Sequence, residues 1–272
     1  MVKIIRKSFP PLFYTILLLM FNKVFAYNHL FDNSFKISTY NDTYILPYYY
    51  TFSPYYKIYP ADKNPAGQKL QHQEMKFQIS FKAPIFGLFD NRFQLYIAYT
   101  QLSYWQFYAK KSQYFRSTDY QPEIFLRINH FLRNKDTFDF GAVHESNGEG
   151  LPKERSWNRL FLNYIIRYKQ FSLSVKPWIL ITKSNSSDIH NRDIEDYMGY
   201  GRLLLKYSYS RYLGASFMFR SFRHPTYEAT LSFPIGLKLF KGYIQYFNGY
   251  GQSLLEYNHR TKAIGVGIAL VV

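Results

Sequence analysis

The feature that most constrains this chain is a repeated alternation of apolar and polar residues. Lys76 to Lys82 reads KFQISFK, with apolar residues at the odd positions and polar residues at the even ones. The same period returns in Tyr227 to Phe233 (YEATLSF) and in Ala263 to Val272 (AIGVGIALVV), where small residues replace the polar ones. Successive side chains of a strand point to opposite faces. The period therefore predicts strands that have one face in an apolar medium.

About twelve such segments follow one another along the chain, separated by turn-forming residues, with no helix-length amphipathic pattern between them. The expected strands are residues 44–53, 73–85, 92–108, 120–132, 136–146, 157–168, 171–182, 195–208, 211–222, 227–238, 241–250 and 261–271.

Both a secreted β-sandwich and a transmembrane barrel agree with this alternation, but three features favour the barrel. The segments are about ten residues long, which is the length that a tilted strand needs to cross a bilayer. Aromatic residues, 21% of the chain, cluster at segment ends such as Tyr48–Tyr50, as in aromatic girdles. The last strand is apolar and can close a barrel without leaving an edge. We therefore predict an all-β, antiparallel, multi-pass barrel of about twelve strands in a bacterial outer membrane.

The first 26 residues have a different character from the rest of the chain. Basic residues (Lys3, Arg6, Lys7) precede an apolar run from Phe13 to Phe21, and Val24-Phe25-Ala26 ends the segment. The alternative reading is a membrane anchor helix, but the run is shorter than the roughly 20 residues that a helix needs to span a bilayer. We expect a signal peptide at residues 1–26 and a barrel domain at residues 27–272.

Composition excludes several classes of site. The chain has no Cys, which rules out disulfides, thiolate metal sites and thiol nucleophiles. Its formal charge is +16, yet it contains no helix-turn-helix, zinc-finger or RNA-binding signature. Anionic lipid head groups are therefore the expected partner of the exposed Lys and Arg residues, rather than nucleic acid.

Three polar residues share the apolar face of two consecutive strands. His144 and Ser146 are in phase with Phe138 and Phe140, and Asn158 is in phase with the apolar positions of the next strand. A polar group facing hydrocarbon is costly without partners. A His beside a Ser, with a third group that orients the imidazole, is the arrangement of an activated Ser nucleophile. The alternative is that these residues merely contact head groups and water at the ends of the strands.

Two short motifs in this region carry a resemblance to a known family. His144-Glu-Ser-Asn-Gly148 and Arg155-Ser-Trp-Asn-Arg159 resemble the signature of the bacterial outer membrane phospholipase A family, which reads H-x-S-N-G and then R-S-W-N-R. Further similar stretches are Tyr99–Gln101, Phe115–Arg116 and Tyr44–Leu46. The likeness runs from about residue 40 to the end of the chain.

The resemblance implies a twelve-stranded barrel and a calcium-dependent hydrolase that cleaves acyl esters of phospholipids (A1 and A2 type) and of lysophospholipids. It implies that Ser146 is the nucleophile, His144 the general base and Asn158 the residue that orients His144. It also implies that the backbone N–H of Gly148 stabilises the oxyanion, together with a calcium-bound water.

The resemblance further implies a homodimer with Ca²⁺ at the subunit interface, where Gln101 matches a buried Gln of the family. The implied ligands are the Glu149 carbonyl, residue 154 and a carbonyl of the other subunit at Ser112. This chain has Glu154 where the family has Ser, and a carboxylate is a good hard-oxygen ligand for calcium. The alternative is that both glutamates are solvated loop charges.

Two functions of another class stay open on the sequence. A non-catalytic porin would conduct ions and would be indifferent to Ser146→Ala. An adhesin would place its function in the stretches 106–119 or 183–193. Three polar residues on a lipid-facing row speak against both.

Overall fold

The structure, a computed structural model, describes residues 36–89, 91–181 and 191–271. The expected signal peptide at residues 1–26 lies outside the described residues. No helix within these ranges has the length and apolar character needed to cross a membrane.

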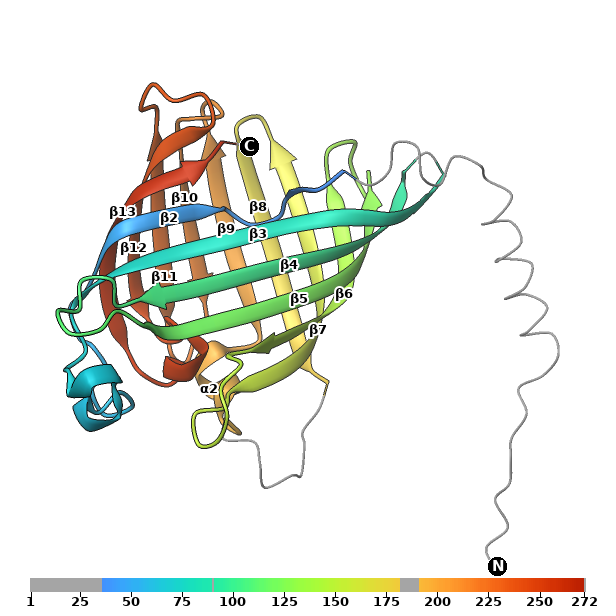
Figure 1. Cartoon of the computed structure of the whole chain (residues 1–272). Helices are drawn as coiled ribbons and strands as arrows, with labels where there is room; N and C mark the ends of the chain where they lie inside the picture. The colour runs from blue at the N-terminus through green and yellow to red at the C-terminus, as the bar shows by residue number, and fades with distance from the viewer. Residues whose placement is uncertain (1–35, 90, 182–190, 272) are drawn as a thin grey trace, which may run out of the picture. The chain divides into compact units, whose positions relative to one another are not determined.

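The described chain forms a closed antiparallel barrel (Figure 1). Strands that follow one another in sequence pair with one another, and the last strand pairs with β2 to close the ring. A two-residue strand, β1 (Ser38–Thr39), adds to the outside of this ring by pairing with β3. The twelve strands of the ring are β2 (Tyr44–Thr51), β3 (Gln73–Leu88), β4 (Phe93–Trp105), β5 (Phe115–Asn129), β6 (Thr137–Ser146), β7 (Ser156–Tyr168), β8 (Phe171–Leu180), β9 (Gly201–Ser208), β10 (Gly214–Arg220), β11 (Thr226–Phe233), β12 (Phe240–Gly249) and β13 (Thr261–Leu270). The predicted all-β barrel and its strand number are confirmed.

Three boundaries differ from the prediction by five or six residues, and one of them is the end of β11, which lies at Phe233, before Pro234, rather than at residue 238. Strand β5 begins at Phe115, earlier than expected, because the polar run Ser117–Asp119 hides the alternation in the sequence. Strand β9 begins only at Gly201, because Ile194–Met198 form the short helix α2. A helix of five residues is too short to display an amphipathic period.

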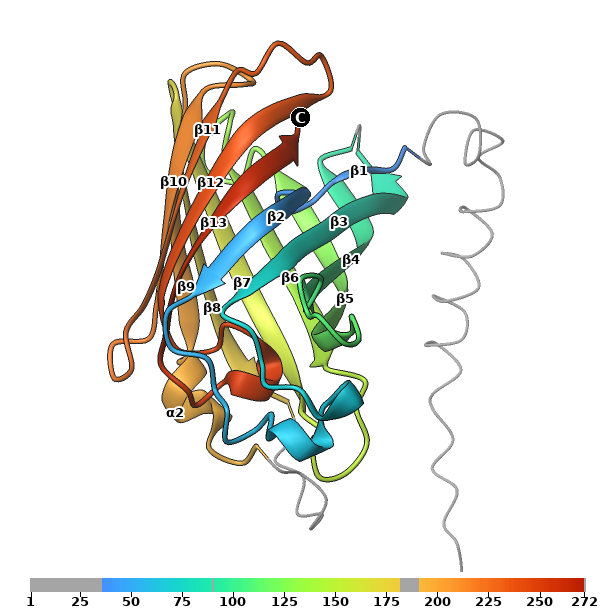
Figure 2. The same cartoon turned by 60° about the vertical axis from the view of Figure 1, so that its left-hand side comes forward.

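The connections differ between the two ends of the barrel. At the loop end lie α2, the 3-10 helices and the connections 52–72, 106–114, 147–155, 181–200, 221–225 and 250–260 (Figure 2). At the turn end lie the connections 89–92, 130–136, 169–170, 209–213 and 234–239, most of which are shorter. In bacterial outer-membrane barrels the long loops face outward and the short turns face the periplasm.

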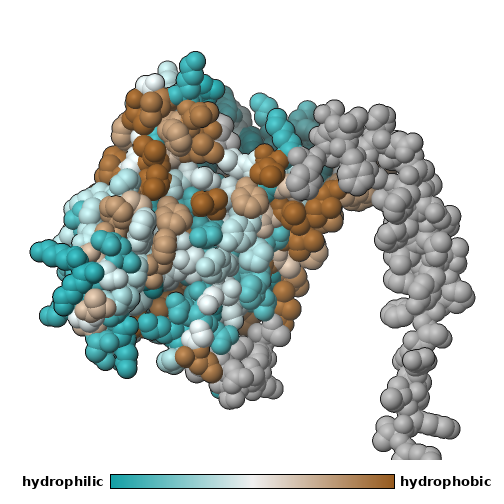
Figure 3. Space-filling view, viewed as in Figure 1, coloured by the Kyte–Doolittle hydropathy of each residue, from teal (hydrophilic) through white to brown (hydrophobic). Residues whose placement is uncertain are grey.

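Alternating side chains give the barrel a polar interior and an apolar exterior. Interior ion pairs join Arg127 to Asp139 (Nε–Oδ1 2.7 Å) and Lys176 to Glu123 (Nζ–Oε2 2.9 Å). On the outer face, large apolar side chains are exposed along the strands, and patches of them are visible on the side shown in Figure 3. They include Ile79, Ile97, Ile124, Phe140 and Leu162. A water-soluble protein has its apolar side chains inside, whereas here they lie outside, as expected for a barrel surrounded by lipid.

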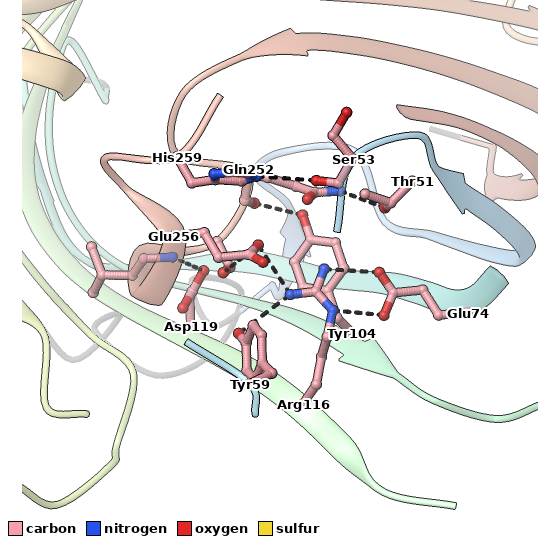
Figure 4. A network of polar contacts seen from close by, with 12 residues as sticks. Thr51, Ser53, Tyr59, Glu74, Tyr104, Arg116, Asp119, Gln252, Glu256 and His259 are labelled. Carbon is pink, nitrogen blue, oxygen red and sulfur yellow. Dashed lines mark hydrogen bonds and ion pairs between the residues drawn. The ribbon is translucent and has the colours of Figure 1, made fainter. Parts of the chain in front are cut away.

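Near the loop end, Arg116 is the centre of a buried polar cluster inside the barrel (Figure 4). Its guanidinium donates to both oxygens of Glu74 (2.7 and 2.8 Å) and to Glu256 Oε2 (3.0 Å). The Asp119 carboxylate accepts the backbone N–H of Leu254 at 2.8 Å. Because Leu254 and Glu256 belong to the 250–260 loop, these bonds hold that loop inside the mouth of the barrel. At this level the interior of the barrel therefore contains buried side chains joined by ion pairs and hydrogen bonds.

Candidate active site

The candidate site lies on the outer face of the β6–β7 hairpin, at its loop end. In the strand register, His144 pairs with Asn158 and Ser146 pairs with Ser156. His144 is exposed, and Ser146 and Asn158 are half-buried. Together they form one outward-facing row, which we call the outer row (His144, Ser146, Asn158), on the side assigned to them from the sequence alternation.

One hydrogen bond organises the outer row. The Nδ1 atom of His144 lies 2.8 Å from the side-chain oxygen of Asn158. Because an amide oxygen only accepts hydrogen bonds, Nδ1 carries the proton and Nε2 is left as the basic nitrogen. Within the described residues, no hydrogen bond joins His144 to Ser146. In the free form of an enzyme such bonds are often long, and they tighten only when substrate is bound.

The nucleophile candidate is flanked by Tyr120 of β5 and by Gly148. Tyr120 is the register partner of Ser146 on the other side of β6. Gly148 has a φ of +65°, and a Cβ atom there would come within 2.9 Å of the Tyr120 ring. Only glycine fits this backbone position without strain. No acceptor for the Gly148 N–H is found in the described part of the chain, so an unpaired backbone donor follows Ser146 by two residues.

Two asparagines hold the 147–155 loop and the start of β7. Asn147 Oδ1 accepts the N–H of Arg155 (2.9 Å), and Asn147 Nδ2 donates to the carbonyl of Lys153 (2.8 Å). Asn191, from the 181–200 loop, donates to the carbonyl of Ser156 at 2.9 Å. Asn147 stands within the sequence signature, but its role as a loop brace had no sequence signal. No feature of the sequence indicated that Asn191 would contact this hairpin.

The neighbouring loops are tied to one another as well. Tyr257 of the 250–260 loop donates a hydrogen bond to Asp193 of the 181–200 loop. Burial and then this bond to Asp193 raise the pKa of the Tyr257 phenol, which keeps it protonated as a donor. The guanidinium of Arg155 lies 6.0 Å from the Tyr257 ring centre. The loop end around the outer row is therefore a connected framework.

The residues that alternate with the outer row form a buried cluster inside the barrel, which we call the inner row (Glu145, Trp157, Arg159). The Glu145 carboxylate accepts hydrogen bonds from Trp157 Nε1 (2.8 Å), from Gln121 Nε2 (2.9 Å) and from the Arg159 guanidinium. Arg159 also lies 3.7 Å from the Trp157 ring centre. This cluster was not predicted from the sequence. Its only sequence signal was the presence of these residues within the two motifs.

The residues implied as calcium ligands provide oxygen donors of the right type. The Glu154 carboxylate has no ion pair or hydrogen bond within the described ranges, and Glu149 is exposed in the same loop. The Ser112 carbonyl accepts a hydrogen bond from Gln68 Nε2 at 2.5 Å, which leaves one of its two lone pairs. The described residues contain no cluster of three His, Cys, Asp or Glu side chains that could hold a metal ion. A calcium ion here would need backbone carbonyls, water and a second chain in addition to Glu154.

Gln101 extends the polar surface sideways from the outer row. It pairs in register with Tyr120, which in turn pairs with Ser146. Its amide bonds to Tyr99 OH (3.1 Å) and to Ser103 Oγ (3.2 Å), and its side chain is half-buried. A polar patch thus crosses the outer faces of β4 to β7. A cavity of about 500 Å³ lies elsewhere, next to α2, and none of the outer-row residues lines it.

Comparisons with known proteins agree with this picture. The family model of Phospholipase A1 matches residues 23–270. A putative phospholipase A1 of Neisseria meningitidis is 36% identical over 247 residues, which cover 85% of this chain and 64% of that protein. The chain therefore spans just under two thirds of this longer relative. Phospholipase A1 of Escherichia coli K12 is 33% identical, with 88% of this chain and 83% of that protein covered.

Solved structures show the same likeness. Outer membrane phospholipase A from Escherichia coli superposes with a TM-score of 0.77 at 31% identity, covering 88% of this chain and 93% of that one. The Salmonella typhi outer membrane phospholipase, solved as a dimer with bound calcium, gives the same TM-score, identity and coverage. A further structure of the Escherichia coli protein is an active-site mutant in which an asparagine is replaced by alanine.

Proposed function

The chain is an outer-membrane β-barrel enzyme that belongs to the phospholipase A1 family, and from this premise we propose that it hydrolyses acyl esters of phospholipids and lysophospholipids with Ser146 as its nucleophile. The observation that carries the proposal is the 2.8 Å bond between His144 and Asn158 on the lipid-facing side of the barrel, two residues from Ser146. A site in this position meets substrate directly in the membrane, without passage through the lumen.

The chemistry follows from the tautomer of His144. Nε2 takes the proton of the Ser146 hydroxyl while Oγ attacks the ester carbonyl of the lipid. The tetrahedral intermediate collapses, the protonated imidazole gives its proton to the departing lysolipid oxygen, and an acyl-enzyme remains. Water, activated by the same nitrogen, then releases the fatty acid. The amide of Asn158 holds the imidazole without adding a charge, which suits a site in apolar surroundings.

The developing oxyanion needs donors that are already in position. The Gly148 N–H is one, and its position two residues after Ser146 supports this assignment. We assign the Glu149 carbonyl, the Glu154 carboxylate and the Ser112 carbonyl of a second subunit as ligands of Ca²⁺. When bound, calcium supplies positive charge and a polarised water beside the oxyanion. The calcium-bound structure of the Salmonella relative supports this proposal.

We also propose that the working unit is a homodimer formed through the patch around Gln101. The dimeric Salmonella structure supports this assembly. A half-buried amide on a lipid-facing surface gains most from a polar partner on another chain. A further proposal is that residues 1–26 are removed on export, which the N-terminal sequence of protein isolated from outer membranes would test.

The decisive experiment is fatty-acid release from mixed phospholipid micelles by refolded protein, with calcium or with chelator. Calcium-dependent release supports the hydrolase and its metal together. Release that persists with chelator keeps the hydrolase and contradicts the calcium assignment. Absence of release from folded dimer with calcium present contradicts the proposed function and favours a porin or an adhesin, which conductance measurements then distinguish.

A further inference from the structure

The turn end of the barrel carries exposed positive charge at every connection. Each of its five connections, counted with the two strand residues on either side of it, contributes at least one exposed Lys or Arg. These residues are Arg92, Arg133, Lys135, Arg167, Lys169, Arg211 and Lys238. Asp90 lies outside the described residues. The remaining acid in these connections, Asp136, is buried and accepts a hydrogen bond from Tyr164 OH at 2.6 Å. The described part of the turn end therefore presents cations without exposed acids.

The same connections also carry the most exposed apolar side chains. Five of the six most exposed large hydrophobic residues within the described ranges lie here, one in each connection, and they are 64 to 76% exposed. They are Phe89, Leu132, Tyr168, Tyr209 and Leu239. Each lies within three residues of a cation of the set above. Single exposed hydrophobics are ordinary on a protein surface, but a regular pairing of one apolar residue with a cation in every turn is not scatter.

The loop end also has exposed apolar residues beside cations, such as Phe222 (89% exposed) next to Arg223, but its charge is mixed. Its exposed residues include Asp62, Glu149 and Asp193 alongside lysines and arginines, so both signs of charge are present there. The excess positive charge of the whole chain therefore does not by itself explain the turn end. In Figure 3, hydrophilic and hydrophobic atoms lie next to each other along the upper edge, where the turns are.

We propose that these seven cations and five apolar residues form a collar that binds the head groups of anionic phospholipids in the membrane leaflet at the turn end. Apolar and aromatic side chains at the end of a transmembrane barrel reach the boundary between acyl chains and head groups. The neighbouring Lys and Arg side chains then lie at the level of the lipid phosphates, which attract them. The collar is at the opposite end of the strands from Ser146, so it is distinct from the catalytic site.

The collar also has a physical consequence for the enzyme. Five anchors spread around one rim fix the depth of the barrel in the bilayer. The strands are rigid, so a fixed depth at the turn end also sets the height of the outer row at the other end. The same contacts would surround the enzyme with anionic lipid.

The test measures the lipid selectivity of the refolded protein in phosphatidylcholine vesicles that contain phosphatidylglycerol. Spin-labelled phosphatidylglycerol and phosphatidylcholine report the fraction of each lipid held at the protein surface. The variant replaces one cation in each turn: Arg92→Gln, Arg133→Gln, Lys169→Gln, Arg211→Gln and Lys238→Gln. The matched control replaces five exposed cations of the loop end: Lys57→Gln, Lys63→Gln, Lys69→Gln, Arg192→Gln and Arg260→Gln.

We expect the wild type to prefer phosphatidylglycerol about threefold at low salt, and we expect the turn-end variant to lose most of this preference while the control keeps it. High salt should reduce the preference of the wild type, because it screens exposed charges. A wild-type protein that shows no preference for phosphatidylglycerol at low salt overturns the proposal, whatever the variants do. So does a loop-end control that loses as much as the turn-end variant. Competition by inorganic phosphate beyond its ionic strength overturns the head-group assignment in favour of a free-anion site.

Fatty-acid release in neutral micelles keeps this test separate from the proposed function. The turn-end variant should release fatty acid at the wild-type rate there, since its substitutions lie far from Ser146. If neither protein releases fatty acid, the proposed function fails while the lipid selectivity still decides the collar.

Discussion

The two faces of the β6–β7 hairpin use the same stretch of chain in opposite ways. In the outer row, a single hydrogen bond joins His144 to Asn158, and Ser146 has no partner among the described residues. In the inner row, one carboxylate, Glu145, collects three donors and is buried. The outer row leaves hydrogen-bonding groups free at the surface for a substrate, while the polar groups of the inner row are buried and, apart from Arg159 Nε, mostly paired with one another. The alternation of side chains along each strand thus places the candidate catalytic groups on one face and the stabilising contacts on the other.

This comparison predicts that substitutions on the two faces of the hairpin have different effects, which single variants can test. Changes in the outer row should lower activity and leave the free energy of unfolding nearly unchanged, because the groups removed have few partners. Changes in the inner row should lower stability first, because a buried charge that loses its partner is strongly destabilising.

The largest effect is expected for Ser146→Ala. Removing the nucleophile should lower the rate of fatty-acid release by about 10⁴-fold or more, with unchanged stability. Ser156→Ala is the matched control, because Ser156 is the register partner of Ser146 on the same face and bonds to Asn191 only through its backbone. Equal losses in the two variants would contradict the assignment of the nucleophile.

Removal of calcium is expected to have the next largest effect. Loss of one oxyanion donor lowers acyl transfer by about 10² to 10³-fold, and chelator should have this effect on the wild type. Glu154→Ala should raise the calcium concentration needed for half-maximal release. Glu149→Ala keeps the carbonyl and should raise it less. A larger shift for Glu149→Ala would reverse the proposed ligand assignment.

Asn158→Ala should lower the rate by about 10 to 100-fold, because His144 loses the group that orients it and sets its tautomer. Its control is Asn163→Ala on the inner face of the same strand, where Asn163 bonds to Asp139 (3.2 Å) and Ser174 (2.6 Å). That control should lower the free energy of unfolding and spare the rate. The reverse pattern would show that the two faces are not separated as described.

The smallest effect on rate is expected for Glu145→Gln. The variant keeps the shape of the side chain but leaves Arg159 without its charge partner, so unfolding in detergent should become easier by about 1 to 3 kcal/mol. The rate should fall only a few-fold, as the hairpin loosens beneath the outer row. A 10³-fold loss of rate at unchanged stability would place Glu145 in the chemistry itself.

The alternation in the sequence determined the barrel, its strand number and the outward direction of His144, Ser146 and Asn158. These follow from a local period of two residues, which needs no knowledge of distant partners. The family resemblance could also be found in a short stretch of sequence, because the three outer-row residues lie on two strands joined by one short loop.

Only the tertiary structure decided which residues from elsewhere meet the hairpin. The register of β5 brings Tyr120 beside Ser146 and Gly148, and the 181–200 loop brings Asn191 to the start of β7. The barrel also directs Gln121 toward Glu145, and it gathers five distant turns at one rim. Strand pairing and ring closure set these contacts across long separations in sequence, and no local pattern of residues encodes them.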